Sequence, residues 1–175
     1  MFTHDFFASL VLVTAAAGAA STGADLGTLP DFNSSGMSSS ERLAARGVQV
    51  YQCRATPGAA SGPMQWVFVA PQADLFDAEG RRVGRHFDGP RWQADDGSRI
   101  VGSVKARVDA PRAGAIPWLL LTTASEGRAG RFSRVAQVQR VNTTGGVAPE
   151  AGCDAASLGV SVRVPYTADY VFLTP

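Results

Sequence analysis

The sequence predicts an all-β fold: a single antiparallel β-sandwich or β-barrel of about eight to ten short strands, with one short N-terminal helix. From Gly47 onward, apolar residues alternate with polar ones or form short continuous runs, as half-buried and fully buried strands do. Turn signals rich in Gly, Pro and Asp separate these segments at intervals of roughly 8–12 residues. No helical periodicity of useful length follows Arg46. A chain of 175 residues suffices for one such domain with its own core.

The residues before Gly47 predict the helix. The motif Ser-Ser-Ser-Glu at residues 38–41 matches a capping box, in which Ser38 bonds the amide of Glu41 and the Glu41 side chain reaches back. Gly47 then provides a left-handed stop after Arg46. We therefore expect a short helix that ends at Arg46.

Strands are expected to follow in order. The segment 47–53 alternates in polarity, whereas 64–69 is apolar on both parities, as a strand buried on both faces would be. The Gly-containing segment 78–80 and the Asp-Gly turn at 95–98 each join two strands as a hairpin, the second through a type I′ turn. The other expected strands are 73–77, 81–87, 90–94, 99–108, 116–123, 132–141, 160–164 and 166–173.

The segment 99–108 has the cleanest alternation of these strands. In a regular strand, successive side chains point to opposite faces of the sheet. We therefore expect Ile100, Val104, Ala106 and Val108 to point inward, and Arg99, Ser103, Lys105 and Arg107 to point outward.

The N-terminal residues predict an export signal. Residues 6–20 form an apolar run whose strongly apolar part is too short for a membrane-spanning helix, which needs about 20 residues. Ala17-Gly18-Ala19 offers the small-x-small pattern that signal peptidase accepts. The first five residues contain no Lys or Arg, which leaves an uncleaved segment as the alternative. We expect a signal peptide at 1–19, a flexible leader at 20–40 and the all-β domain at 41–175. The product would be exported to the periplasm or the extracellular space, with no membrane span after cleavage.

The two cysteines, Cys53 and Cys153, fit this compartment. An even number of cysteines in an exported protein most simply forms a disulfide. The bridge would close a long loop, for which the chain-entropy model gives about 4.7 kcal/mol of stabilisation. The alternative is two separate buried thiols. We expect no structural zinc site, because such a site needs four Cys or His ligands.

Composition and motifs exclude several classes of function. The net charge of +1 is too small to attract nucleic acid or an anionic membrane electrostatically. The sequence contains no glycine-rich dinucleotide or phosphate loop, no Gly-x-Ser-x-Gly and no His-Glu-x-x-His. We therefore expect no cofactor, no metal and no nucleic-acid partner, and we favour a function other than catalysis.

His86 is the first candidate functional residue, because it is the only histidine outside the extreme N-terminus. In a regular strand, where every second side chain lies on the same face, His86 would share a face with Arg82 and Gly84. It is either a half-exposed strand-end histidine whose ring bonds a turn carbonyl, or a general base or ligand-binding group. The acids that would orient its ring in the second case are Asp88, Asp95 and Asp96.

Four further residues complete the candidate ligand-binding set. Trp92 and Trp118 are either core residues or a stacking wall for a sugar or an aromatic ligand. Arg140, in a strand among valines, either points outward or forms an inward anion-binding fork. Asp96 also has a purely local explanation, since Asx side chains bond their own backbone in turns. The set is His86, Trp92, Asp96, Trp118 and Arg140.

A series of spaced motifs runs from about Gly47 to Phe172. The motifs are Tyr51-Gln52-Cys53, Trp66-x-Phe68, Pro71-x-Ala73-x-Leu75, Gly84-x-His86-Phe87-x-Gly89-Pro90-x-Trp92, Asp96-Gly97-Ser98, Ile116-Pro117-Trp118-Leu119-Leu120, Gln139-Arg140-Val141-Asn142-Thr143-x-Gly145-Gly146-x-Ala148-Pro149 and, near the end, Cys153 with Val164-Pro165-Tyr166-Thr167-Ala168-x-Tyr170-x-Phe172. Together they resemble the family catalogued as domain of unknown function 3455. The resemblance implies an exported bacterial or fungal protein without a defined activity, and it places the five candidate residues in family motifs.

Three functions are consistent with these observations. We favour an exported β-domain that binds a small molecule or an envelope glycan near His86 and Trp92. One alternative is a hydrolase or isomerase that uses His86 with an acidic partner. The other is a structural or stress-related surface protein without a ligand. The sequence does not indicate an oligomeric state.

Overall fold

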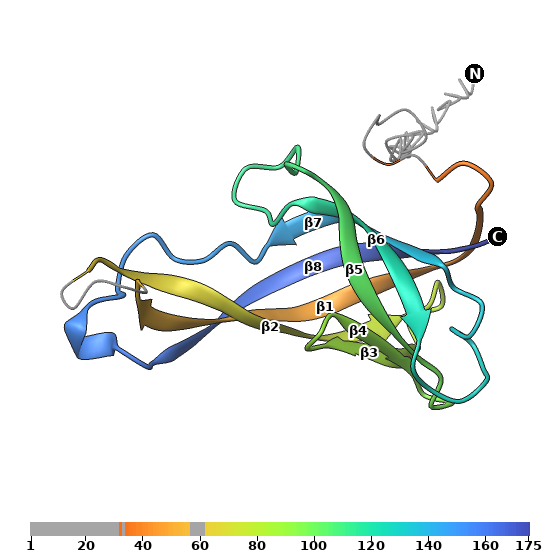
Figure 1. Cartoon of the computed structure of the whole chain (residues 1–175), viewed down its shortest axis with the longest axis horizontal. Coiled ribbons are helices and arrows are strands. Elements are labelled where there is room, and N and C mark those ends of the chain that lie inside the picture. The colour runs from red at the N-terminus through yellow and green to blue at the C-terminus, as the bar shows by residue number, and fades with distance from the viewer. Residues whose placement is uncertain (1–31, 33, 57–61) are drawn as a thin grey trace, which may run out of the picture.

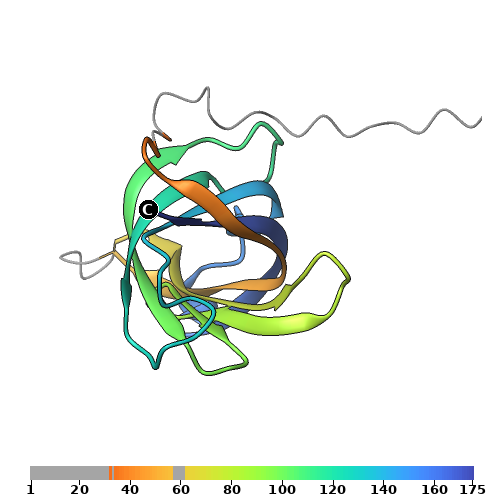
Figure 2. The same ribbon diagram turned by 90° about the vertical axis from the view of Figure 1, so that its right-hand side faces the viewer.

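The chain forms a closed antiparallel barrel in the computed structural model, which describes residue 32 and residues 34–56 and 62–175 (Figure 1). Each strand pairs with the next one along the chain, and β1 pairs with β8 to complete the circle (Figure 2). The all-β prediction is therefore confirmed, as a barrel rather than a sandwich. The strands are β1 Ser38–Ala55, β2 Met64–Phe76, β3 Arg82–Phe87, β4 Arg91–Ala94, β5 Arg99–Val108, β6 Trp118–Ser125, β7 Gln137–Gly145 and β8 Ser161–Thr174, with the short 3-10 helix η3 at Ala155–Ser157.

The predicted helix before Gly47 is wrong, because these residues belong to β1. Strand β1 pairs with β8 from Ser38 onward and with β2 from Ala44 onward. Leu43 and Ala45 are buried in the barrel interior, as alternation in a strand requires. The local capping signal is therefore overridden by ladder pairing on both sides of the strand. No helix in the described residues is long and apolar enough to cross a membrane.

The predicted signal peptide at 1–19 lies outside the described residues, as do residues 20–31 and 33 of the predicted leader. Strand β1 begins at Ser38, so the folded domain starts inside the segment that we expected to be the leader.

Two pairs of expected strands are continuous, and prolines account for the apparent breaks. Pro71 lies within β2, and Pro165 lies within β8. At both positions the strand pairs with β1 and has no described neighbour on its other side. Proline lacks an N–H, so a strand tolerates it where only one neighbour needs hydrogen bonds.

Apolar side chains fill one end of the barrel. The segment between β6 and β7 brings Phe132 into this end, where its ring stacks on Phe172 with the ring centroids 4.6 Å apart. The amide of Arg131 donates to Asp96 Oδ2 at 2.7 Å, and the amide of Phe132 donates to Ser98 Oγ at 3.1 Å. The segment is thereby held against the β4–β5 turn, and this end of the barrel is closed.

The other end is extended by β1, β2 and β8, which project beyond the shorter strands (Figure 1). The predicted disulfide lies here. It joins Cys53 of β1 to Cys153 in the segment between β7 and β8, with a Cα–Cα distance of 5.3 Å. The bridge ties this long segment to the barrel wall.

The wall is incomplete on one side of this extended end. Strand β3 pairs with β2 only over Ala73–Phe76, and β4 pairs with β5 only over Arg99–Val101. In the described residues, the part of β2 before Ala73 and the part of β5 after Gly102 therefore have no paired strand on this side, and Gly102 itself donates to the Pro90 carbonyl at 2.9 Å. On this unpaired side, residues of β2, β5 and the β3–β4 turn line a lateral opening into the interior.

A β-bulge corrects the predicted faces of β5. Val104 is paired with Leu121 and Ala106 with Leu120, so Lys105 is an extra residue. One extra residue moves every later side chain to the opposite face. Val104 consequently borders the interior, whereas Ala106 and Val108 pack on the outside of the barrel against a buried cluster. The members of this outer cluster are Phe32, Trp118, Leu120 and Val141.

Candidate functional site

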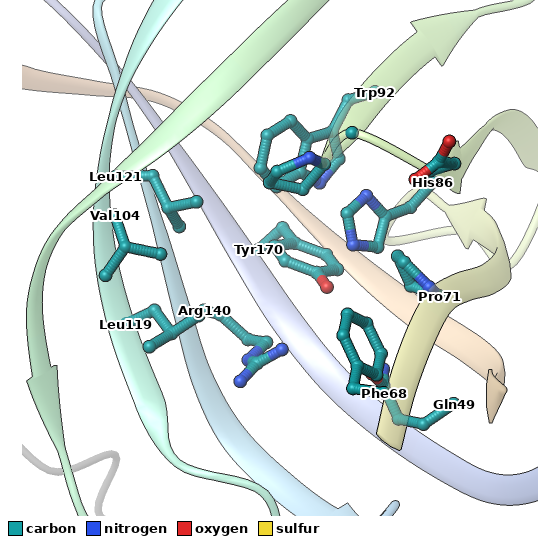
Figure 3. A pocket seen from close by; sticks show the side chains of 13 residues that line it. Gln49, Phe68, Pro71, His86, Trp92, Val104, Leu119, Leu121, Arg140 and Tyr170 are labelled. Atoms are coloured by element: carbon teal, nitrogen blue, oxygen red, sulfur yellow. The ribbon is translucent and has the colours of Figure 1, made fainter. Parts of the chain in front are cut away.

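The interior of the extended half holds a cavity of about 320 Å³ beside the lateral opening, and Figure 3 shows the side chains that line it. Its volume falls at the lower end of the range for ligand pockets, roughly 300–1,000 Å³. Eight-stranded barrels of this kind either fill their interior with side chains or hold one small ligand there. The lining residues are Gln49, Phe68, Pro71, His86, Asp88, Gly89, Pro90, Trp92, Val104, Leu119, Leu121, Arg140 and Tyr170.

Three aromatic rings form the inner wall of this cavity. His86 and Trp92 are opposite each other on β3 and β4, and their rings stack with centroids 4.6 Å apart and planes inclined by 15°. Tyr170 of β8 meets both rings edge-on, with centroid distances of 4.9 Å to His86 and 5.5 Å to Trp92. Gly102 makes room for the indole, because a Cβ at this position would lie 2.8 Å from Trp92 Cζ3.

The imidazole of His86 is buried and neutral. Its side chain is 3% exposed, so the expectation of a half-exposed histidine is wrong. Burial lowers the pKa of His86 to about 3, with a smaller contribution from the positive charge of Arg140 and against the opposing effect of the hydrogen bond to the Arg91 carbonyl. Nδ1 lies 2.9 Å from Arg91 O and must donate to it, because a carbonyl only accepts. The neutral ring therefore keeps its unprotonated nitrogen at Nε2.

The prediction that His86 shares a face of the strand with Arg82 is wrong, because the pairing between β2 and β3 is irregular. Leu75 is paired with Gly84 and Phe76 with Arg82, so Val83 is an extra residue. Arg82 therefore points outward, where it forms ion pairs with Asp74 and Asp95, while Gly84 and His86 are buried. The exposed arginine gave no valid indication of the face of His86.

The low pKa of His86 makes stability depend on pH. Below its ordinary pKa of 6.5 the unfolded chain takes up a proton on His86, and the folded protein does not until about pH 3. Unfolding is thus favoured as the pH falls. We expect His86 to account for a loss of about 2 kcal/mol between pH 7 and pH 5. Urea denaturation of wild type and His86→Gln at both pH values tests this: the loss should be smaller in the variant by about that amount, and equal losses would contradict it.

Arg140 supplies the positive charge of the inner cavity. It lies on β7 between Leu119 of β6 and Tyr170 of β8, and Figure 3 shows its guanidinium directed into the space below Tyr170. Nε and Nη2 both donate to the carbonyl of Pro117, at 3.1 and 2.9 Å. Within the described residues no carboxylate lies at salt-bridge distance from Arg140. Its charge is not neutralised by the barrel.

Tyrosine hydroxyls surround this charge. Burial raises the pKa of Tyr51, Tyr166 and Tyr170, and Arg140 opposes the rise in each case. All three phenols are therefore protonated near neutral pH. Tyr51 Oη donates to the carbonyl of Gly146 at 2.6 Å, and Tyr166 Oη lies 3.4 Å from Tyr170 Oη. These hydroxyl groups make the part of the cavity beside Arg140 polar.

A second hollow of about 610 Å³ adjoins the inner cavity and forms its outer vestibule. The two share five lining residues, which are Gln49, Phe68, Val104, Leu119 and Arg140. Phe68 and Val104 are 49% and 57% exposed, so apolar side chains flank the entrance. Arg140 and Leu119 stand at the junction between the vestibule and the inner cavity.

The cavity brings together three of the five candidate residues: His86, Trp92 and Arg140. Asp96 is not among them. Its carboxylate interacts with the Ser98 side chain and accepts from the amides of Arg131 and Ser98, and these hydrogen bonds lower its pKa. Asp96 therefore holds the segment between β6 and β7 against the β4–β5 turn at the closed end of the barrel. Trp118 also lies elsewhere, since its side chain packs in the outer cluster.

None of the three aspartates expected to orient His86 bonds its ring. Asp88 is exposed at the rim of the cavity, Asp95 pairs with Arg82, and Asp96 holds the turn. In the described residues no group of three or more His, Cys, Asp or Glu side chains is placed to hold a metal ion.

Several lining residues were not singled out from the sequence. Tyr170 and Gln49 are buried on β8 and β1, and the Gln49 side chain interacts with the Tyr166 hydroxyl. Phe68 stands at the entrance, where its ring meets Tyr51 edge-on at 5.7 Å. The alternation of β1 could have indicated Gln49, because a glutamine at an inward position is a buried polar residue that calls for explanation.

The fold and the site define a class of protein: an eight-stranded up-and-down barrel with a ligand-sized interior cavity. The chain belongs to the family described as "Protein of unknown function (DUF3455)", whose model matches residues 34–174. The predicted family is thus confirmed. The comparison with curated proteins gives no match. The family description names no activity, so the function is argued from the cavity itself.

Proposed function

We propose that this protein is exported and binds one small, largely apolar molecule inside its barrel. The observation that carries the proposal is the cavity of about 320 Å³ beside the rings of His86, Trp92 and Tyr170. Ligand pockets are typically apolar and aromatic, with a few polar groups that fix the orientation of the ligand. Here the polar groups gather at Arg140 and the tyrosine hydroxyls, and the rest of the lining is mostly apolar.

The lining favours an apolar molecule over a glycan. A buried sugar presents many hydroxyl groups, each of which needs a hydrogen-bond partner. The inner cavity offers mainly hydrocarbon surface for this purpose. The apolar and aromatic lining side chains are Phe68, Pro71, Pro90, Trp92, Val104, Leu119 and Leu121.

The lateral opening supports the same proposal by offering an entry route. Phe68 of β2 and Val104 of β5 flank it, and both are large apolar residues exposed to solvent. Exposed apolar side chains that line a cavity entrance are typical of binding sites. An apolar ligand would meet the vestibule first and then pass Leu119 and Arg140 into the inner cavity.

The Cys53–Cys153 disulfide supports the proposed export. Disulfides persist in oxidising compartments such as the periplasm and the extracellular space. The sequence pattern of residues 1–19 predicts a signal peptide that would deliver the chain there.

The structure around His86 favours ligand binding over catalysis by a hydrolase or isomerase, and the hollow interior favours it over a purely structural role. A hydrolase or isomerase built on His86 needs an acid to orient the ring, and the ring bonds the Arg91 carbonyl instead. A purely structural barrel gains stability from filling its interior, whereas this interior is filled at one end and hollow at the other.

Filling the junction of the two hollows tests the proposal. N-phenyl-1-naphthylamine, a neutral fluorescent probe, is expected to bind wild type with an increase in its emission. Leu119→Trp places an indole in the cavity and should weaken this binding at least tenfold. The matched control is Leu158→Trp, since Leu158 is 55% exposed and lies outside the cavity lining. The control should bind like wild type.

The probe titration can contradict the proposal in two ways. The first is the absence of any saturable binding to wild type. The second is equal affinity in wild type and Leu119→Trp, with both proteins folded by circular dichroism. Either result would contradict the binding of apolar ligands inside the barrel.

A further inference from the structure

Arg140 is an unusual charge for an apolar cavity. It is half-buried, and its neighbours across the sheet are Leu119 and Tyr170. A partly buried charge without a counter-ion destabilises a protein, so such residues are usually paired. Arg91, which is also partly buried, has such a partner: it pairs with Glu126 at 2.7 Å. The described part of the chain provides no such partner for Arg140.

The guanidinium is held in a fixed position. Its Nε and Nη2 donate to one carbonyl, that of Pro117, which orients the planar group. A guanidinium carries five N–H donors, so donors remain for a ligand after these bonds. Besides these two bonds, the Arg140 side chain also hydrogen-bonds the Tyr170 hydroxyl. The protein therefore presents preorganised donors and a positive charge at the junction of the vestibule and the inner cavity.

We propose that the ligand is a monocarboxylic acid with an apolar body, whose carboxylate binds Arg140 and whose body lies against Trp92 and Leu121. This inference rests on the proposed function. The carboxylate would neutralise the charge of Arg140 and accept from its remaining donors. The Tyr170 phenol, which burial keeps protonated, lines the same cavity and can also donate. The apolar body would exclude water from the inner wall.

The charge count favours a carboxylate over a phosphate or a dianion. Among the described residues, Arg140 is the single cation that lines the inner cavity. Arg107 lines only the vestibule and is exposed. Asp88 is exposed at the rim of the inner cavity and would repel additional negative charge. The single positive charge of Arg140 is therefore matched by the single negative charge of a carboxylate.

A pair of probes of equal shape tests this inference. 2-Naphthoate carries a carboxylate, and 2-naphthamide replaces it by a neutral amide on the same ring system. Competition against N-phenyl-1-naphthylamine should show that wild type binds 2-naphthoate at least tenfold more tightly than 2-naphthamide. Arg140→Met should weaken 2-naphthoate at least tenfold and change 2-naphthamide by less than threefold. Arg163→Met, at an exposed arginine of β8, is the matched control and should leave both affinities unchanged.

The outcomes separate this inference from the proposed function. Equal affinities of wild type for the two naphthalene probes would overturn the carboxylate assignment and leave binding of apolar ligands intact. So would an equal loss of both probes in Arg140→Met. If no probe binds wild type, N-phenyl-1-naphthylamine included, the proposed function itself fails. The comparison in wild type decides the question even if Arg140→Met does not fold.

Discussion

Replacing Cys53 and Cys153 together by alanine is expected to lower the free energy of unfolding by about 3–5 kcal/mol. The bridge spans a sequence separation of 100 residues. Cross-linking a loop of this length restricts the unfolded chain, and the chain-entropy model gives about 4.7 kcal/mol. In the folded protein Cys53 is fully buried on β1, so the loss also includes packing at the barrel wall. Urea denaturation of the two proteins under oxidising conditions measures the difference.

Reduction provides the control for this prediction. Wild type treated with dithiothreitol should unfold at nearly the same urea concentration as the double variant, and the reductant should not affect the variant. A loss below 1 kcal/mol would mean that the segment between β7 and β8 is held by other contacts. The bond from Tyr51 to the Gly146 carbonyl is one of these, and it lies closer to the cavity than the bridge does. We therefore expect the inner cavity to keep its probe affinity within about threefold when the bridge is absent.

The strands were predictable because their signals are local. Alternating polarity and turn residues such as Asp96-Gly97 indicate strands and hairpins without reference to the rest of the chain. The start of β1 was not predictable in this way, since Ser38 and Glu41 match a helix cap. What decides its structure is the pairing with β8 and β2, which are distant in sequence. Glu41 in fact pairs with Arg131 across the closed end.

The candidate site was predictable only in part, because single extra residues reverse the face of a strand. Val83 and Lys105 are such residues, and nothing in their local sequence marks them. Trp118 was misleading for another reason. It packs on the outside of the barrel because Phe32, before the first strand, covers that face. Arg140 could be assigned to the interior only once its neighbours across the sheet were known.

Replacing Trp92 by alanine is expected to lower the free energy of unfolding by about 3–5 kcal/mol and to raise the pKa of His86. The first effect follows from the burial of the indole, which is 1% exposed. The second follows from the stacked rings of His86 and Trp92, 4.6 Å apart. Without the indole, water reaches the imidazole, and burial no longer holds its pKa near 3. An NMR titration of the His86 ring measures the change.

Trp118→Ala is the matched control, because it removes the same side chain from the outer cluster. Trp118 is 6% exposed, so the loss of stability should be of similar size, about 3–5 kcal/mol. It is not one of the described cavity-lining residues, and its ring is not among those that meet His86, so the pKa of His86 should stay low. The affinity for N-phenyl-1-naphthylamine should fall in Trp92→Ala alone. If both variants raise the pKa of His86 equally, general loosening of the barrel explains the rise, and the stacked indole does not. If Trp92→Ala alone does so, the same ring keeps His86 neutral and forms the apolar wall of the proposed binding site.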